Sequence, residues 1–286
     1  MALITLIAAP GGLPTSRATA LAASWGCTPP AWLAENEACQ MTGTAPEGAW
    51  EALQADGIDL CVQDAAPAPI KLLLADMDST MIGQECVDEL ADLAGVGPRV
   101  ADITARAMNG ELDFNAALTE RVGLLKDLPV SVIDQVMAER ITYASGGATL
   151  IATMKARGAL TALVSGGFTA FTSRVGAHLG FDRNRANILI EADGKLTGAV
   201  GQPILGAEAK VRALQDYATE LGITDDAVAA VGDGANDLPM LQKAALGVAL
   251  HAKPSVQAQA KLRVNHGDLT ALLYLQGIAK ADFVTP

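Results

Sequence analysis

The residues of this 286-residue chain that could do chemistry begin with two aspartates after its most apolar segment. Asp76 and Asp78 follow residues 70–75, a run that is apolar except for Lys71. Such a run favours a strand buried on both faces of a parallel sheet, and open α/β sheets bind ligands at the carboxyl ends of their strands. Two carboxylates one residue apart can share a hard cation, or one can attack phosphorus while the other donates a proton. Taken alone, the pair is equally well explained as an acidic turn.

A hydroxyl and two glycines follow a second apolar run, residues 160–164. Ser165 and the backbone N–H groups after it, beginning with Gly166, could bind phosphate oxygens. An ordinary Gly-rich turn is the simpler explanation of this segment by itself.

An acidic cluster follows a third apolar run, residues 227–231. Asp233, Asn236 and Asp237 offer three oxygen ligands within five residues, and Mg²⁺ prefers carboxylates and water. A calcium-binding EF-hand loop is excluded, because the spacing does not continue to the further ligands and the terminal glutamate of that loop.

Three predicted strand ends of one sheet therefore carry a carboxylate pair, a hydroxyl with backbone donors, and a carboxylate cluster. A phosphoryl group in transfer carries dispersed negative charge, so its catalysis needs positioning, a metal ion and cationic or N–H donors. Lys210 adds a cation, although a single lysine there would otherwise be a solvated helix residue. The combination predicts a magnesium-dependent phosphoryl-transfer site.

The elements that would position these residues divide the chain into three predicted domains. Residues 1–66 indicate a small α+β domain. Residues 67–82 and 146–286 alternate apolar strands with helices, which predicts a doubly wound, mostly parallel α/β core. Residues 83–145 show helical patterns only, and they predict a helical cap inserted after the first core strand. Within the core, residues 186–200 predict a β-hairpin around an Asp-Gly turn.

The composition favours a folded protein and argues against several classes of partner. Half of the residues are apolar and 18% are charged, enough to bury a large core. The net charge of −12 argues against nucleic-acid binding, which needs a basic surface. The four cysteines lack a CxxC pair, and the apolar N-terminus lacks a basic region and breaks at residues 10–12. We therefore expect a cytoplasmic protein without a membrane span.

The motifs resemble those of the haloacid dehalogenase (HAD) superfamily of phosphohydrolases, over residues 72–279. The matching segments are Asp-Met-Asp-Ser-Thr at 76–80, Ser-Gly-Gly-Phe at 165–168, Lys210, and Gly-Asp-Gly-Ala-Asn-Asp at 232–237. The resemblance implies a HAD-like Rossmannoid core and a Mg²⁺ cofactor. Glu85 and residues 114–122 are similar to the phosphoserine phosphatase pattern within this superfamily. That similarity implies hydrolysis of O-phosphoserine to serine and phosphate, the last step of serine biosynthesis.

The same resemblance implies a role for each site residue. Asp76 is the nucleophile that forms an aspartyl-phosphate, and Asp78 acts first as general acid and then as general base. Magnesium is held by the Asp76 side chain, the Asp78 backbone carbonyl and Asp233, with Asp237 in support. The phosphoryl oxygens are held by Ser165, the Gly166 N–H, Lys210 and Asn236.

Four cap residues would recognise the rest of the substrate. In the family, Glu85 matches a glutamate that pairs with the substrate ammonium, and Arg121 matches an arginine that pairs with its carboxylate. A zwitterion needs one anion and one bidentate cation, so these residue types fit. Met108 and Phe114 match apolar residues that close over the substrate. Without the resemblance, the charged pair would be solvated helix residues and the apolar pair would belong to the cap core.

Two other functions stay open at this point. One is a phosphatase or phosphotransferase of the same superfamily that acts on another small phosphomonoester, such as phosphohomoserine. The other is a receiver-like phospho-acceptor signalling module. The predicted cap and the second aspartate argue against that module, because a stable aspartyl-phosphate would not have a general base beside it.

The N-terminal domain is where the resemblance weakens. Some family members carry an amino-acid-sensing ACT domain there, with the order βαββαβ. Here we count three clear strands and two helices, and residues 32–41 are ambiguous. A degenerate ACT-like module and a structural or dimerising extension, with a homodimer as the consequence, are both consistent with the sequence.

Overall fold

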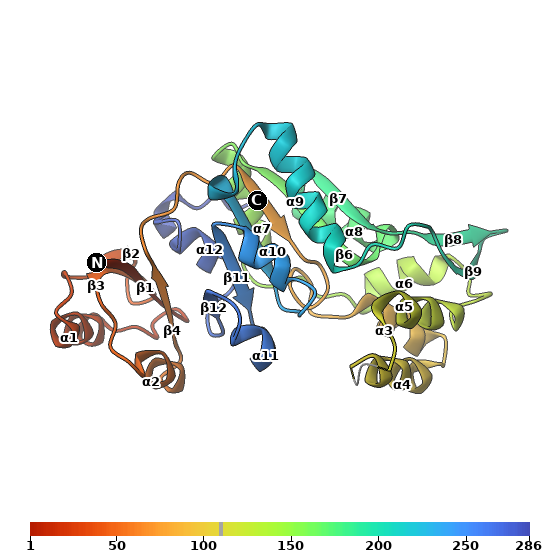
Figure 1. Ribbon diagram of the computed structural model, residues 1–286, viewed down its shortest axis with the longest axis horizontal. Helices are drawn as coiled ribbons and strands as arrows, with labels where there is room; N and C mark the ends of the chain where they lie inside the picture. The colour runs from red at the N-terminus through yellow and green to blue at the C-terminus, as the bar shows by residue number, and fades with distance from the viewer. Residues whose placement is uncertain (109–110) are drawn as a thin grey trace. The chain divides into compact units, whose positions relative to one another are not determined.

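The computed structural model describes residues 1–108 and 111–286 (Figure 1), apart from the side chain of Met108. Its contacts separate the chain into two compact units. The first consists of Met1–Leu74, Ala144–Thr161 and Tyr217–Pro286, and the second of Ala75–Tyr143 and Ala162–Asp216. Among the described residues, no helix combines the length and the apolar character that crossing a bilayer requires.

An antiparallel four-stranded sheet forms the N-terminal part of the first unit. Its strands are β1 (Ala2–Ala8), β2 (Ala31–Ala34), β3 (Ala38–Gly43) and β4 (Ile58–Gln63), in the order β2-β3-β1-β4. With α1 (Thr15–Trp25) and α2 (Ala49–Ala55), the chain follows βαββαβ. The count of three strands is wrong by one, because β2 has only four residues and an irregular register against β3. Sensing and dimerising roles for this region stay predictions.

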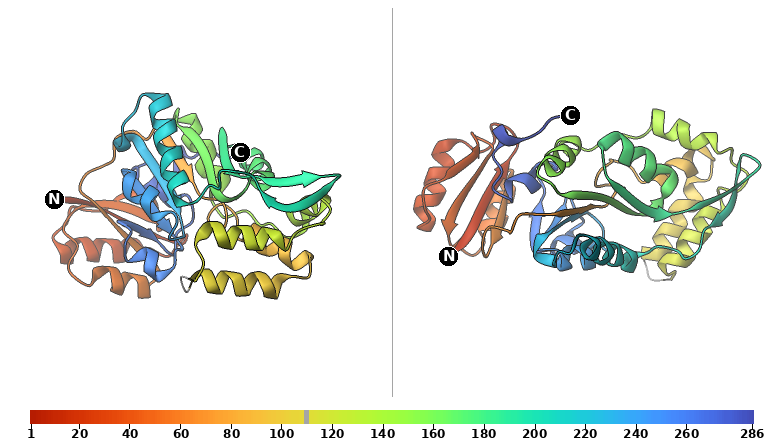
Figure 2. Two further views of the ribbon diagram at one scale, coloured as in Figure 1. Left: turned by 45° about the vertical axis from the view of Figure 1, so that its right-hand side comes forward. Right: turned by 90° about the horizontal axis from the view of Figure 1, so that it is seen from above.

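The side chains of β1 and β4 alternate between the two faces of this sheet, and the apolar ones show which face the helices cover. Leu6, Ile58 and Leu60 belong to a buried apolar cluster that includes residues of α1 and α2, and Figure 2 shows both helices on one side of the sheet. Asp59 lies between Ile58 and Leu60, so its side chain points to the opposite face. It is fully buried there and accepts hydrogen bonds of 2.8 to 3.0 Å from the backbone N–H groups of residues 265–267.

A six-stranded sheet has the order β12-β11-β10-β5-β6-β7. Its strands are β5 (Leu72–Ala75), β6 (Leu160–Phe168), β7 (Arg183–Asn187), β10 (Val228–Gly232), β11 (Leu246–Leu250) and β12 (Leu262–Val264). The connecting helices are α7 (Gly147–Ala156), α8 (Thr169–Leu179), α9 (Ala207–Leu221), α10 (Leu238–Lys243), α11 (Pro254–Gln257) and α12 (Ala271–Tyr274), with 3₁₀ turns at Asp225–Ala227 and Lys280–Asp282. The pairs β10–β11, β11–β12 and β6–β7 are parallel. The predicted doubly wound, mostly parallel α/β fold is confirmed.

The second core strand is longer than its apolar run. We expected it to end at Val164 and a glycine-rich turn to follow, but β6 continues through Phe168. Its register against β7 shifts between Val164 and Phe168. Ser165 and Gly166 are therefore part of an irregular strand extension, which holds them more firmly than a free turn would.

Among the described residues of the insertion that follows β5, four helices are present. They are α3 (Cys86–Leu93), α4 (Gly97–Met108), α5 (Phe114–Gly123) and α6 (Ser131–Glu139). The chain enters and leaves this insertion side by side, because Ile82 forms a β-bridge with Tyr143 and the Gly83 N–H donates to the Thr142 carbonyl at 2.9 Å. The helical character predicted for this region is confirmed, and the predicted domain limits stay predictions.

The predicted hairpin is present as β8 (Leu189–Ala192) and β9 (Lys195–Val200). Asp193 and Gly194 have φ angles of 51° and 73°, and a two-residue turn of type I′ needs positive φ at both positions. The hairpin is hydrogen-bonded to the loop after α5, through the Val130 N–H to the Gly194 carbonyl and the Leu196 N–H to the Leu128 carbonyl. It therefore belongs to the same unit as the helical insertion.

Candidate active site

Asp76 is the first residue after β5, whose four residues are all buried. Its Oδ1 lies 2.7 Å from the Nζ of Lys210 and accepts a hydrogen bond of 2.8 Å from the Met77 N–H. Asp76 is 6% exposed and Lys210 1% exposed. A buried carboxyl group is stabilised by a charged partner and by hydrogen-bond donors, and both are present here. These two contacts fix the orientation of Asp76 at the end of a core strand.

Asp78 is linked to the strand extension of β6. Its Oδ1 accepts from the Cys86 N–H at 2.9 Å, and its Oδ2 accepts from the Ser165 hydroxyl at 3.2 Å. The Ser165 Oγ in turn accepts from the Gly167 N–H at 2.8 Å. Burial, and after it the charge of Glu85, raises the pKa of Asp78 to about 7. A carboxyl group with that pKa can hold a proton at neutral pH and donate it to a leaving oxygen.

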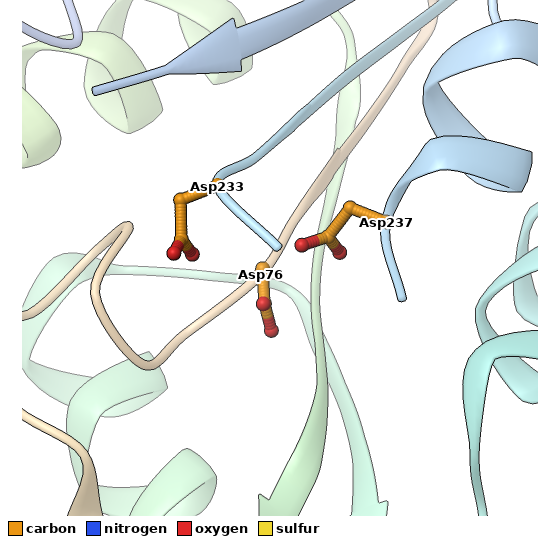
Figure 3. A group of neighbouring side chains, drawn as sticks. All are labelled: Asp76, Asp233 and Asp237. Carbon is orange, nitrogen blue, oxygen red and sulfur yellow. The ribbon is translucent and has the colours of Figure 1, made fainter. Parts of the chain in front are cut away.

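Asp76, Asp233 and Asp237 form a group of three carboxylates (Figure 3). One oxygen from each lies within 4.8 Å of the other two. Asp233 follows β10 directly, and Asp237 is fully buried and accepts from the Gly234 N–H at 3.0 Å. Three like charges this close repel one another unless a cation joins them, and carboxylate oxygens suit a hard divalent ion. The group fits a metal site; Asn236 belongs to the same loop.

Glu85 and Arg121 both belong to the helical insertion. Glu85 is the residue before α3, and its Oε1 accepts from the Ser79 hydroxyl at 2.8 Å. Arg121 lies in the last turn of α5, and its Nε donates to the Ala117 carbonyl at 3.3 Å. Burial lowers the pKa of Arg121, and the charges of Asp88 and Glu85 oppose that shift. The guanidinium therefore lies within electrostatic reach of Glu85, as recognition of a zwitterion would require.

Phe114 is the first residue of α5, after Asp113, whose side chain caps the helix by accepting from the Ala116 N–H at 2.7 Å. The Phe114 ring lies against two glycines. A β-carbon placed on Gly166 or on Gly206 would be 3.3 Å from it. Gly206 was not predicted as part of the site, and only its contact with the ring reveals it. The predicted contact of Met108 lies outside the described side chains.

The family model for haloacid dehalogenase-like hydrolases matches residues 73–242. The chain belongs to this family. The resemblance drawn from the motifs is thereby confirmed. In this hydrolase the matched segment begins with the strand before Asp76 and ends beyond the loop that carries Asp233 and Asp237, so it contains all three carboxylates of Figure 3. A buried group of this kind is typical of the metal site of the family.

Several relatives of this hydrolase are phosphoserine phosphatases. The one from Haemophilus influenzae is 47% identical over 220 residues, which cover 76% of this chain and 70% of the relative. A solved structure of a probable phosphoserine phosphatase from Vibrio cholerae, unliganded, has a TM-score of 0.83 and 34% identity, and covers 98% of this chain and 88% of its own. A solved structure of a phospho-aspartyl intermediate analogue of phosphoserine phosphatase has a TM-score of 0.67 and 42% identity. The match covers 72% of this chain and 99% of the solved chain.

Proposed function

We propose that this chain is a phosphoserine phosphatase that hydrolyses O-phosphoserine to serine and phosphate through an aspartyl-phosphate on Asp76. The single observation that carries the chemistry is the buried Asp76 carboxylate, fixed 2.7 Å from Lys210. The substrate is inferred from the relatives, whose names state this activity. One solved structure among them is a phospho-aspartyl intermediate analogue of phosphoserine phosphatase.

In the first step an Asp76 carboxylate oxygen forms a bond to phosphorus and the bond from phosphorus to the serine oxygen breaks. Attack by an anion on an anion is unfavourable, and Lys210 offsets the charge at the nucleophile. The proton that the departing serine oxygen needs comes from Asp78, whose raised pKa supports that role.

In the second step a water oxygen forms a bond to phosphorus and the bond from phosphorus to Asp76 breaks. Asp78, now a carboxylate, takes the proton of this water. The Ser165 hydroxyl, the Gly166 N–H, Lys210 and Asn236 hold the phosphoryl oxygens. Ser165 is already hydrogen-bonded to Asp78 at 3.2 Å, which keeps the phosphoryl subsite and the acid together.

The metal is Mg²⁺ in this proposal. Asp76, Asp233 and Asp237 present the hard oxygen ligands that this ion prefers, and the backbone carbonyl of Asp78 would add one more. When bound, magnesium offsets the negative charge of the phosphoryl oxygens. The donor set fits hard divalent cations as a class, and the choice of Mg²⁺ among them rests on the resemblance to the family.

The serine part of the substrate is held by the helical insertion. Glu85 pairs with the ammonium group, and Arg121 forms a bidentate pair with the carboxylate. Phe114, whose ring lies against Gly166 and Gly206, closes the site over the substrate. The resemblance assigns the same role to Met108.

The test is a turnover panel with Mg²⁺ and three substrates: O-phosphoserine, O-phosphohomoserine and p-nitrophenyl phosphate. We expect the highest kcat/KM for O-phosphoserine. Arg121→Ala should raise KM for O-phosphoserine and leave KM for p-nitrophenyl phosphate unaffected, because O-phosphoserine has a carboxylate and p-nitrophenyl phosphate has none. Arg106→Ala is the matched control, since Arg106 lies in the insertion and pairs with Glu120 at 3.0 Å.

Preference for O-phosphohomoserine, or unchanged O-phosphoserine kinetics in Arg121→Ala, would contradict the substrate assignment. Release of one phosphate per protein molecule without further turnover would favour the receiver-like alternative instead.

A further inference from the structure

Asn187, the last residue of β7, is a buried side chain that nothing in the proposed mechanism uses. It is 2% exposed. Its Nδ2 donates to the Gly166 carbonyl at 2.8 Å and to the Leu205 carbonyl at 3.1 Å. Its Oδ1 accepts from the Leu205 N–H at 2.7 Å. The amide thus uses both donors and its acceptor on the backbones of two segments that lie 21 and 18 residues away in the sequence.

The two segments that Asn187 joins lead to the phosphoryl subsite. Gly166 follows Ser165, whose hydroxyl donates to Asp78. Leu205 lies two residues before α9, and Lys210 is the fourth residue of that helix. Because Leu205 is held through both its N–H and its carbonyl, the start of α9 cannot shift without breaking two hydrogen bonds.

The same pair of segments also supports the cap. The Phe114 ring contacts Gly166 on one segment and Gly206 on the other. A β-carbon added to either glycine would lie 3.3 Å from the nearest atom of the ring. One aromatic ring can rest on both glycines only while the distance between the two segments is fixed. Asn187 supplies that fixed distance from the side of the strand.

We propose that Asn187 is a positioning residue for the phosphoryl subsite. It holds Gly166 and the start of α9 together, so that Ser165 and Lys210 act on one phosphoryl group and Phe114 closes over both segments. The assignment rests on the proposed function only in placing the phosphoryl group at these residues.

The sharpest variant is Asn187→Asp, which keeps the shape of the side chain. It replaces the NH₂ donor by an oxygen that faces two carbonyl oxygens, so both donated bonds are lost and repulsion takes their place. We expect kcat/KM for O-phosphoserine to fall about 100-fold, as small displacements of a catalytic group do. Inhibition by inorganic phosphate should weaken in parallel. Inhibition by free L-serine should stay unchanged, because Glu85 and Arg121 bind that part.

Asn184→Ala is the matched control. Asn184 lies on the same strand, is exposed, and accepts a hydrogen bond from the Thr172 hydroxyl at 3.0 Å. The kcat/KM of Asn184→Ala and its inhibition constants for phosphate and L-serine should equal those of the unmodified protein. If Asn187→Asp does not fold, Asn187→Ser, which keeps one donor, is measured in its place.

Two outcomes would overturn the proposal. One is a variant with a lower Tm but unchanged kcat/KM and phosphate inhibition below its Tm, since Asn187 would then serve the fold alone. The other is an equal loss of phosphate and L-serine inhibition, which would mean general loosening. Failure of the proposed function can be distinguished from failure of this proposal. If the protein hydrolyses p-nitrophenyl phosphate but not O-phosphoserine, the substrate assignment is wrong. The effect of Asn187→Asp is then measured with p-nitrophenyl phosphate as the substrate.

Discussion

Replacing Asp237 by asparagine should stabilise the metal-free protein while it weakens metal binding. Asp237 is fully buried, and its carboxylate lies within 4.8 Å of those of Asp76 and Asp233. Two unit charges at that distance repel by about 3.5 kcal/mol at an effective dielectric constant of 20. Lys210 offsets the charge of Asp76, so Asp76 contributes less to this repulsion than Asp233 does.

Solvent at the partly exposed Asp233 lowers this repulsion to about 1 to 2 kcal/mol. The amide oxygen of asparagine can still accept the Gly234 N–H that Asp237 accepts at 3.0 Å, so the hydrogen bond is retained. For a chain of this size, about 1 kcal/mol corresponds to a Tm shift of roughly 2 to 4 °C. We therefore expect Asp237→Asn to raise Tm by a few degrees in EDTA.

Magnesium should reverse the order of stability. A ligand at 100 times its Kd stabilises the native protein by about 2.7 kcal/mol, and a variant with one fewer carboxylate loses most of that gain. The assay is thermal unfolding in EDTA and in excess Mg²⁺, with turnover measured beside it. Asp193→Asn, in the exposed hairpin turn, removes the same charge and should change neither Tm value. If Asp237→Asn is no more stable than the unmodified protein in EDTA, or gains the same Tm from Mg²⁺, the metal-site reasoning is refuted.

Three further changes should act on other parts of the molecule. Gly206→Ala places a β-carbon 3.3 Å from Phe114, and about 1 kcal/mol of side-chain strain should lower kcat/KM roughly fivefold. Steady-state kinetics of Gly206→Ala, alone and combined with Phe114→Leu, check this prediction. If the double variant recovers no activity, the prediction is wrong. Lys210→Met should lower kcat by about 10² to 10³ because a donor and the partner of Asp76 are lost, and near-normal turnover would exclude that role. Asp59→Ala removes the acceptor of three backbone N–H groups and should destabilise by about 3 kcal/mol or more, seen as a lower urea midpoint with unchanged turnover of the folded fraction.

The parts of the site that could be predicted from the sequence are those with a local pattern. Asp76 follows a strand recognisable from four consecutive apolar residues, and Asp233 follows another. An acid after a buried strand is a property of adjacent residues, so the sequence displays it directly. The hairpin at Asp193 belongs to the same class, because its turn depends on two neighbouring residues with positive φ.

The parts that escaped prediction depend on contacts between distant segments. Ser165 and Gly166 were expected in a turn, since glycines do not favour strands, yet pairing with β7 extends β6 through Phe168. Asn187 has three partners, all of them backbone groups, and a backbone group leaves no mark in the sequence. Only the folded geometry shows that one amide joins two site segments.

The N-terminal sheet has a face whose burial the sequence alone does not predict. The order of residues in β4 places Ile58 and Leu60 on one face and Asp59 and Cys61 on the other. An alternation with an aspartate would ordinarily assign that second face to solvent. Yet Asp59 and Cys61 are both buried, bonded to residues 265–267 and to the Arg263 carbonyl. Both faces of the N-terminal sheet are therefore covered, one by helices and the other by the segment that begins at β12.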